Sequence, residues 1–343
     1  PTHLPSRERQ TMENPFHFKG PLTGKDKRFS NRTSEIMRIQ SRIAADRPQS
    51  VSIVGQLSIG KTSLLNWFCD PESQEDFLDD PGQYVFIALH LSQDPPQDPE
   101  AFFERINQAW KELGGEGMEP TFDGFNGMVK GLMQEGKRLL LFLDNFGRVT
   151  QNSGFPLGFF SFMRSVANSN DVGYVTTSSQ DLQKLCYTQD IEESPFFNIF
   201  TTVHLEPFKE KDAREMVVRL SQEGGEVFGE ETDWILELAG GAPYLLQLTG
   251  HTAFQIREEG KLDRKKLAEA AFGEAREYLG KLWGELTPVQ QDVLRATGVG
   301  KNIERRHEYA AEALMRYGHL IQEEGKYQFR AELLDRFVKE HGN

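Results

Sequence analysis

The sequence predicts an α/β protein with a parallel sheet, followed by a small helical lid domain and a C-terminal winged-helix domain. Between residues 48 and 208, short apolar segments alternate with helical stretches, the pattern of a sheet covered by helices on both faces. The apolar segments are continuous rather than alternating, as expected for strands buried on both sides. The predicted strands are Ser50–Val54, Tyr84–Leu89, Arg138–Leu143, Gly173–Thr177 and Thr202–Leu205.

After residue 208 the strand pattern stops, and residues 209–280 are predicted to form the helical lid. Its first helix is indicated by apolar residues at helical spacing, and two more helices, 231–239 and 243–258, are separated by two glycines. The residues of the first apolar face are Ala213, Met216, Val217 and Leu220, and the glycines are Gly240 and Gly241.

Residues 281–343 have the pattern of a winged helix. Thr287-Pro-Val-Gln290 is a capping box with proline at the first helical position, and it predicts a helix start. A second helix at about 306–317, a hairpin over 319–329 and a final apolar-faced helix follow. Residues 1–47 precede the α/β segment as a basic segment.

Composition and charge limit the possible functions. No apolar run approaches the roughly 18 residues needed to cross a membrane, and the first residues lack an apolar signal region. Cys69 and Cys186 are expected to be reduced. We therefore expect a cytoplasmic protein without membrane contact.

The net charge is −13, but residues 1–47 carry ten Lys/Arg against five Asp/Glu, and residues 281–343 are neutral. The acidic middle of the chain disfavours DNA binding as the main function.

A P-loop carries the strongest chemical signal. Gly55-Gln-Leu-Ser-Ile-Gly60-Lys61-Thr62 lies between a predicted strand and a predicted helix. Glycines allow backbone N–H groups to surround phosphate oxygens at the helix N-terminus. Lys61 would reach the β- and γ-phosphates, and the Thr62 hydroxyl would bind Mg²⁺. The predicted phosphate-binding residues are Gly55, Gln56, Leu57, Ser58, Ile59, Gly60, Lys61, Thr62 and Ser63.

Asp144 directly follows the predicted strand that ends at residue 143. It is the expected Walker B carboxylate, which would bind Mg²⁺ directly or through water. A strand-ending aspartate that caps the next turn is the alternative. Asn145 follows, where many ATPases of this class carry glutamate. An asparagine can hold a water molecule but cannot accept its proton, so we expect slow hydrolysis of ATP to ADP and phosphate unless another carboxylate or subunit helps.

Two further polar positions are candidates for the nucleotide site. Ser178, within Thr176-Thr-Ser-Ser179, follows a predicted strand and would sense the γ-phosphate, although a plain turn explains it equally well. Arg148, close after Asp144, could act in its own site or a neighbour's, and surface solvation is the favoured interpretation.

An ordered set of motifs resembles the STAND branch of the AAA+-related ATPases. The set is Asn14-Pro-Phe16, Arg28-Phe-Ser-Asn-Arg32-Thr-Ser-Glu35, the P-loop, Leu143-Asp-Asn-Phe146, Ser194–Phe200 with His204–Pro207, and Gly240-Gly241-Ala-Pro243. The resemblance spans about residues 14–340. It implies an ATP-operated switch in which nucleotide lies between core and lid and the winged helix senses its state. It also implies that Arg32 and Pro243 flank the adenine.

The sequence departs from the family pattern at three positions. Asn31 stands where the first motif usually has glycine, and Asn145 stands where a second acid is usual. Ala331 stands where related winged helices often place a histidine that touches the nucleotide.

Three functions remain open. The first is an ATP-binding switch with Mg²⁺ that uses its nucleotide state to control self-association or engagement of a separate effector protein. The alternative is a nucleotide-controlled DNA-binding regulator of the origin-recognition or transposition ATPase type, which the charge does not favour. The third is an ATP-binding scaffold without turnover.

Overall fold

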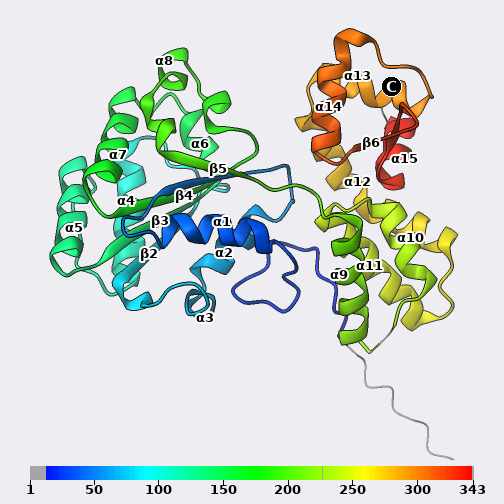
Figure 1. The fold of residues 1–343 in the computed structure, drawn as a ribbon, viewed down its shortest axis with the longest axis horizontal. Coiled ribbons are helices and arrows are strands. Elements are labelled where there is room, and N and C mark those ends of the chain that lie inside the picture. The colour runs from blue at the N-terminus through cyan, green and yellow to red at the C-terminus, as the bar shows by residue number, and fades with distance from the viewer. Residues whose placement is uncertain (1–12, 226, 342–343) are drawn as a thin grey trace, which may run out of the picture. The chain divides into compact units, whose positions relative to one another are not determined.

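A computed structural model describes residues 13–225 and 227–341, which fold into two compact units (Figure 1). The core unit spans Pro21–Leu205. The C-terminal unit comprises the residues from Glu206 onward together with the segment that ends at Gly20. The chain therefore passes between the units next to Gly20 and again next to Leu205. None of the described helices is long and apolar enough to cross a membrane.

The strands of the core unit are β1 (Ser50–Val54), β2 (Tyr84–His90), β3 (Arg138–Asp144), β4 (Val172–Ser178) and β5 (Phe200–His204). Within the described residues they form a five-stranded sheet in the order β2-β3-β4-β1-β5, and all neighbouring strands are parallel. The predicted α/β fold with a parallel sheet is therefore confirmed. No predicted strand end differs from the observed one by more than two residues.

The longer helices of the core unit are α1 (Thr33–Ile43), α2 (Lys61–Cys69), α4 (Pro99–Glu112), α5 (Phe122–Gln134) and α7 (Leu157–Ser169). Shorter ones are α3 (Pro71–Gln74), α6 (Gly147–Thr150) and α8 (Gln189–Glu192). Single 3-10 turns cover Pro81–Gln83, Leu182–Leu185 and Pro195–Ile199.

The two faces of the sheet carry separate hydrophobic clusters. Successive residues of β3 alternate between them, as the pleat of a strand requires. Leu139 and Leu141 belong to the cluster with α4, α5 and α7, whereas Leu140 and Phe142 belong to the cluster with α1 and α2 (Figure 1). Burial on both faces explains why β3 is a continuous apolar run, with its polar residues, Arg138 and Asp144, at the two ends of the strand.

The helices of the C-terminal unit are α9 (Glu210–Glu223), α10 (Glu230–Ala239), α11 (Pro243–Glu259), α12 (Arg264–Glu285), α13 (Pro288–Gly298), α14 (Glu308–Arg316) and α15 (Glu332–His341). A 3-10 turn, Arg305–His307, precedes α14, and strands β6 (Leu320–Glu323) and β7 (Lys326–Phe329) form an antiparallel hairpin before α15. This order of elements is the one the sequence predicts for a winged helix.

Helix α12 runs through residue 280, where the sequence analysis divides the helical lid from the winged helix. Its outer surface is joined to the last helix by ion pairs, Arg276–Glu340 and Arg336–Glu269. One helix therefore packs with elements on both sides of the predicted boundary. The division of residues 209–280 from 281–343 stays a prediction.

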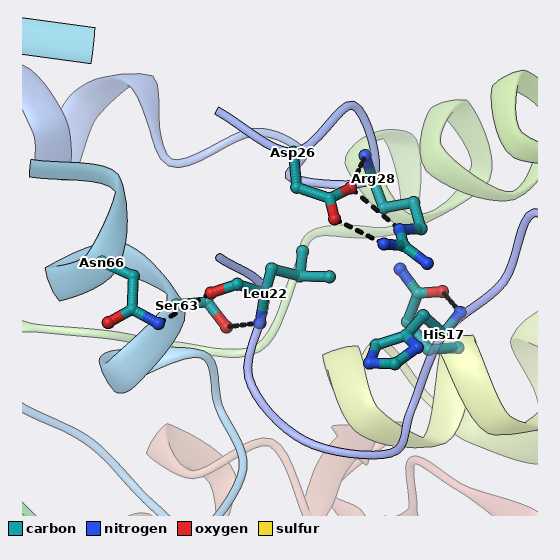
Figure 2. A network of polar contacts seen from close by, with 7 residues as sticks. His17, Leu22, Asp26, Arg28, Ser63 and Asn66 are labelled. Carbon is teal, nitrogen blue, oxygen red and sulfur yellow. Dashed lines mark hydrogen bonds and ion pairs between the residues drawn. The ribbon is translucent and has the colours of Figure 1, made fainter. Parts of the chain in front are cut away.

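The predicted basic segment 1–47 contributes to both units, and its first twelve residues lie outside the described residues. Phe16 is buried in the C-terminal unit, where its ring stacks on Phe228 at a centroid distance of 5.9 Å. Nearby, the His17 backbone N–H donates to the Gln247 side chain at 2.9 Å (Figure 2). Residues 21–47 lie in the core unit.

Candidate nucleotide-binding site

The loop between β1 and α2 has the backbone of a phosphate cradle. Gly60 is the N-cap of α2 and has a φ of 102°, a left-handed conformation that favours glycine. No side chain among the described residues caps this helix end, so the first N–H groups of α2 are not occupied by a capping side chain. Ser58 is also left-handed, with a φ of 55°. A helix N-terminus of this kind favours an anion.

Lys61 lies back over its own loop. Its Nζ donates to the carbonyl oxygen of Gly55 at 2.6 Å and to that of Gln56 at 2.8 Å. Gly55 is required for space, since a Cβ there would lie 2.8 Å from Ile59 and 3.1 Å from the Leu205 carbonyl oxygen. The loop is thus closely packed around the lysine that the sequence assigns to the phosphates.

Asp144 is a buried carboxylate at the C-terminal end of β3, with 2% of its surface exposed. Its Oδ2 accepts a hydrogen bond from Thr62 Oγ1 at 3.0 Å, and its Oδ1 accepts one from Thr177 Oγ1 at 2.5 Å. Burial alone would raise the pKa of Asp144, but the hydrogen bonds from His90, Thr177 and Thr62 together lower it below its ordinary value. Asp144 is therefore ionised at neutral pH.

The Thr62–Asp144 pair fits a magnesium ion. Mg²⁺ prefers hard oxygen ligands, and it is commonly bound in nucleotide sites by a P-loop hydroxyl and a Walker B carboxylate. The two oxygens are already 3.0 Å apart, and the carboxylate is charged.

Asn145 has a backbone role in the turn after β3. Its φ is 59°, and its N–H donates to Thr177 Oγ1 at 2.8 Å. Asparagine tolerates this left-handed conformation better than most residues with a side chain. The conformation gives a physical reason for asparagine here, and the predicted effect on catalysis stays a prediction.

Ser178 and Ser63 bond to backbone groups near the P-loop. Ser178 Oγ donates to the Gln180 carbonyl oxygen at 2.6 Å, while its own carbonyl accepts from the Gly55 N–H at 3.1 Å. This is the geometry of a turn, and γ-phosphate sensing by Ser178 stays a prediction. Ser63 Oγ accepts from the Leu22 N–H at 3.0 Å, and Asn66 Nδ2 donates to the Leu22 carbonyl oxygen at 2.8 Å (Figure 2).

Arg32 lies beside the P-loop and is 7% exposed. One guanidinium nitrogen donates to the Ile59 carbonyl oxygen at 3.0 Å, and another pairs with Glu35 at 3.0 Å. The preceding Asn31 has a φ of 59°, which explains why asparagine can replace the family's glycine there. Pro243 opens α11 in the C-terminal unit, so its assignment to the adenine, like that of Arg32, stays a proposal.

His90 is a residue of this site that the sequence analysis did not select. It is the last residue of β2 and pairs in register with Asp144 of β3, with 3.4 Å between its Nδ1 and Asp144 Oδ2. The hydrogen bond and the charge of Asp144 raise the pKa of His90. The sequence held a usable signal, because the carboxyl ends of neighbouring parallel strands meet at one edge of a sheet.

The fold and the site together define a P-loop NTPase. The chain belongs to the novel STAND NTPase 2 family (nSTAND2), whose model matches residues 45–299, more than half of the sequence. No curated protein matches the chain.

Solved structures of distant sequence share the fold. A Walker-type ATPase of Pyrococcus abyssi is 16% identical, with a TM-score of 0.67 over 94% of this chain and 99% of that one. The ORC2 protein of Aeropyrum pernix, described in ADPNP-ADP complexes, is 13% identical, with a TM-score of 0.63 over 92% and 97% of the two chains. The ORC1 protein of the same organism, in complex with DNA, is 14% identical, with a TM-score of 0.50 over 91% and 93%.

Proposed function

We propose that this protein is an ATP-operated switch. It binds ATP with Mg²⁺ at the P-loop, hydrolyses ATP slowly, and uses its nucleotide state to control self-association or the engagement of a separate effector protein. The observation that carries the proposal is the P-loop with its paired Thr62 and Asp144, in a member of the novel STAND NTPase family.

Binding begins at the P-loop backbone. The uncapped N–H groups of α2 and the left-handed Ser58 and Gly60 would hold phosphate oxygens. Lys61 would exchange the carbonyl oxygens of Gly55 and Gln56 for the β- and γ-phosphates, which offer it a stronger, charge-assisted interaction. Thr62 and Asp144 would hold Mg²⁺, whose positive charge offsets the charge of the phosphates.

Hydrolysis is slow in this proposal because Asn145 offers no proton acceptor beside the Walker B carboxylate. Asp144 itself is already hydrogen-bonded to Thr62 and Thr177. A long-lived ATP state suits a switch, since the signal lasts as long as the γ-phosphate.

Both segments that connect the two units begin beside the P-loop, and this supports a switch. On one side, Leu22 is bonded to Ser63 and Asn66 of α2. On the other, the Leu205 N–H donates to the Val54 carbonyl oxygen at 2.7 Å, one residue before Gly55. A shift of the loop on nucleotide binding would therefore reach both segments that lead to the C-terminal unit.

Size-exclusion chromatography with light scattering tests the proposal. The protein is run without nucleotide, with ADP and with a non-hydrolysable ATP analogue, each with Mg²⁺. We expect the analogue to change the mass or the elution volume relative to ADP. The same elution volume and mass in every state, with nucleotide bound, would favour a static ATP-binding scaffold.

A nucleotide-controlled DNA-binding regulator is the second candidate. The +5 charge of residues 1–47 favours it, whereas residues 281–343 carry no net charge. DNA binding through phosphates weakens steeply between about 50 and 200 mM salt. A salt-dependent gel shift of a DNA duplex would support this candidate, and no shift at 50 mM salt would remove it.

A further inference from the structure

The described part of the chain begins with a short segment, residues 13–20, that belongs to the C-terminal unit although the rest of that unit begins at Glu206. We call this segment the arm. Phe16 is 2% exposed and lies over Gly250 of α11, where an added Cβ would be 2.4 Å from the ring. Pro15 lies against Gly224, where an added Cβ would be 2.7 Å from Pro15 Cγ. The two glycines thus leave room for the arm.

Hydrogen bonds fix the arm in place. We call its docking surface the socket, which includes Gly224, Phe228, Gln247 and Gly250. Asn14 Nδ2 donates to the His251 carbonyl oxygen at 3.0 Å, and Asn14 Oδ1 accepts the Phe16 N–H at 3.0 Å. The Gln247 side chain accepts the His17 N–H at 2.9 Å (Figure 2). The socket therefore fits one particular segment, Asn14-Pro-Phe16, by shape and by hydrogen bonds.

The connection from the arm to the core unit is short and ends beside the P-loop helix. Residues 19–21 lead to Leu22, whose N–H and carbonyl oxygen bond to Ser63 and Asn66 of α2 at 3.0 Å and 2.8 Å (Figure 2). A shift of α2 on nucleotide binding would strain these connecting residues. A short connection under strain favours domain swapping, because an identical segment of a second copy makes the same contacts while the connection relaxes.

We propose that the ATP-bound protein self-associates by exchanging arms, so that the arm of one copy fills the socket of a second copy. This inference rests on the proposed function and names the surface through which the copies associate. A second copy is the partner that carries the segment the socket fits. Exchange loses none of the arm contacts, so the equilibrium depends on protein concentration and on strain in residues 19–21, which a nucleotide at the P-loop changes.

Two complementary variants test the exchange. Phe16→Ala removes the ring from the arm and leaves the socket intact. Gly250→Met fills the place of that ring in the socket and leaves the arm intact, since even a Cβ there would be 2.4 Å from the Phe16 ring. Phe122→Ala is the matched control, because Phe122 is a half-buried phenylalanine of α5 in the core unit. Mass is measured by size-exclusion chromatography with light scattering, with Mg²⁺ and either ADP or a non-hydrolysable ATP analogue.

With the analogue we expect the wild type and Phe122→Ala to reach about twice the monomer mass, as reciprocal exchange requires. Phe16→Ala and Gly250→Met should each stay monomeric. An equimolar mixture of these two variants should form dimers again, because the intact arm of one fits the intact socket of the other, and this recovery also shows that both are folded.

Self-association of Phe16→Ala alone to the wild-type extent would overturn the inference, as would a mixture that stays monomeric. A wild type that keeps its monomer mass with the analogue bound would contradict nucleotide-controlled self-association itself. The two failures are therefore distinguishable.

Discussion

The Lys61 ammonium lies against two carbonyl oxygens of the P-loop, and it is the charge that a triphosphate would recruit. We expect Lys61→Ala to fold but to gain little stability from Mg-ATP. The wild type at ATP about a hundredfold above Kd should gain about 2.7 kcal/mol by linkage. Thermal melts with and without Mg-ATP measure this gain. Lys137→Ala is the control, because Lys137 lies outside the P-loop and forms an exposed ion pair with Glu135. Equal gains of stability with Mg-ATP in Lys61→Ala and the wild type would contradict nucleotide binding at the P-loop.

His319 predicts a second residue-level effect, this time on stability. It is buried, its Nε2 has no hydrogen-bond partner among the described residues, and burial lowers its pKa to about 4. The ordinary histidine pKa is about 6.5, so between pH 6.5 and pH 4 the unfolded chain binds the proton more readily. Stability is therefore lost as the pH falls through this window, by roughly 3 kcal/mol from this group.

Urea unfolding of the wild type and of His319→Leu between pH 7 and pH 4 tests this effect. The leucine variant cannot titrate at this position, so its stability should fall less over the same window. Parallel losses in the two proteins would show that the buried imidazole is not the cause.

The left-handed residues show where sequence reasoning reaches its limit. Asn31 and Asn145 depart from the family pattern, and from the sequence alone Asn145 predicts slow hydrolysis. At both positions the φ of 59° adds a conformational reason for asparagine. Backbone conformation of this kind is set by the surrounding fold, and a single sequence does not reveal it.

At the scale of elements, a glycine turn joins three parts of the C-terminal unit. Phe208 donates its N–H to the Gly241 carbonyl oxygen at 2.9 Å, and its own carbonyl accepts from Arg330 at 2.6 Å. Burial lowers the pKa of Arg330. Gly241 has a φ of 93°, and a Cβ there would lie 2.6 Å from the Phe208 carbonyl oxygen.

We therefore expect Gly241→Ala to destabilise the protein by roughly 2 kcal/mol or more, through backbone strain and the close contact. Gly273 is the matched control, because it lies inside α12 and an added Cβ would meet no described atom within 4 Å beyond its chain neighbours and the backbone of its own helix. Gly273→Ala should stabilise the protein by about 0.5–1 kcal/mol. Chemical denaturation of both variants measures the difference. Equal effects of the two substitutions would contradict the assigned role of the turn.

Local signals predicted the elements well where they were strong. The continuous apolar run of β3 and the capping box at Thr287 both appear in the structure as predicted. The position of the segment around Phe16 was harder to predict, because its partner Phe228 is more than 200 residues away in sequence. For His90 the predicted strand ends offered a signal, but its contact with Asp144 also depends on strand order and register. Long-range pairing leaves little trace in a single sequence.

At the scale of the whole molecule, the proposed switch requires a nucleotide that favours one arrangement of the two units over another. A ligand shifts such an equilibrium only by its difference in affinity for the two states. Moving it from 1:99 to 99:1 requires about 5.5 kcal/mol of differential binding. The γ-phosphate is the chemical difference between ATP and ADP. Lys61 is the group assigned to it, and the Thr62–Asp144 pair is assigned to the Mg²⁺ that accompanies it.

Small-angle X-ray scattering of the ADP-bound and ATP-analogue-bound protein, at matched concentration and with mass measured in parallel, tests the switch most directly. The account predicts different scattering profiles for the two states, with or without a change in mass, and no such difference in Lys61→Ala. Identical profiles and identical mass for wild-type protein with nucleotide bound would contradict the switch and leave a static nucleotide-binding protein.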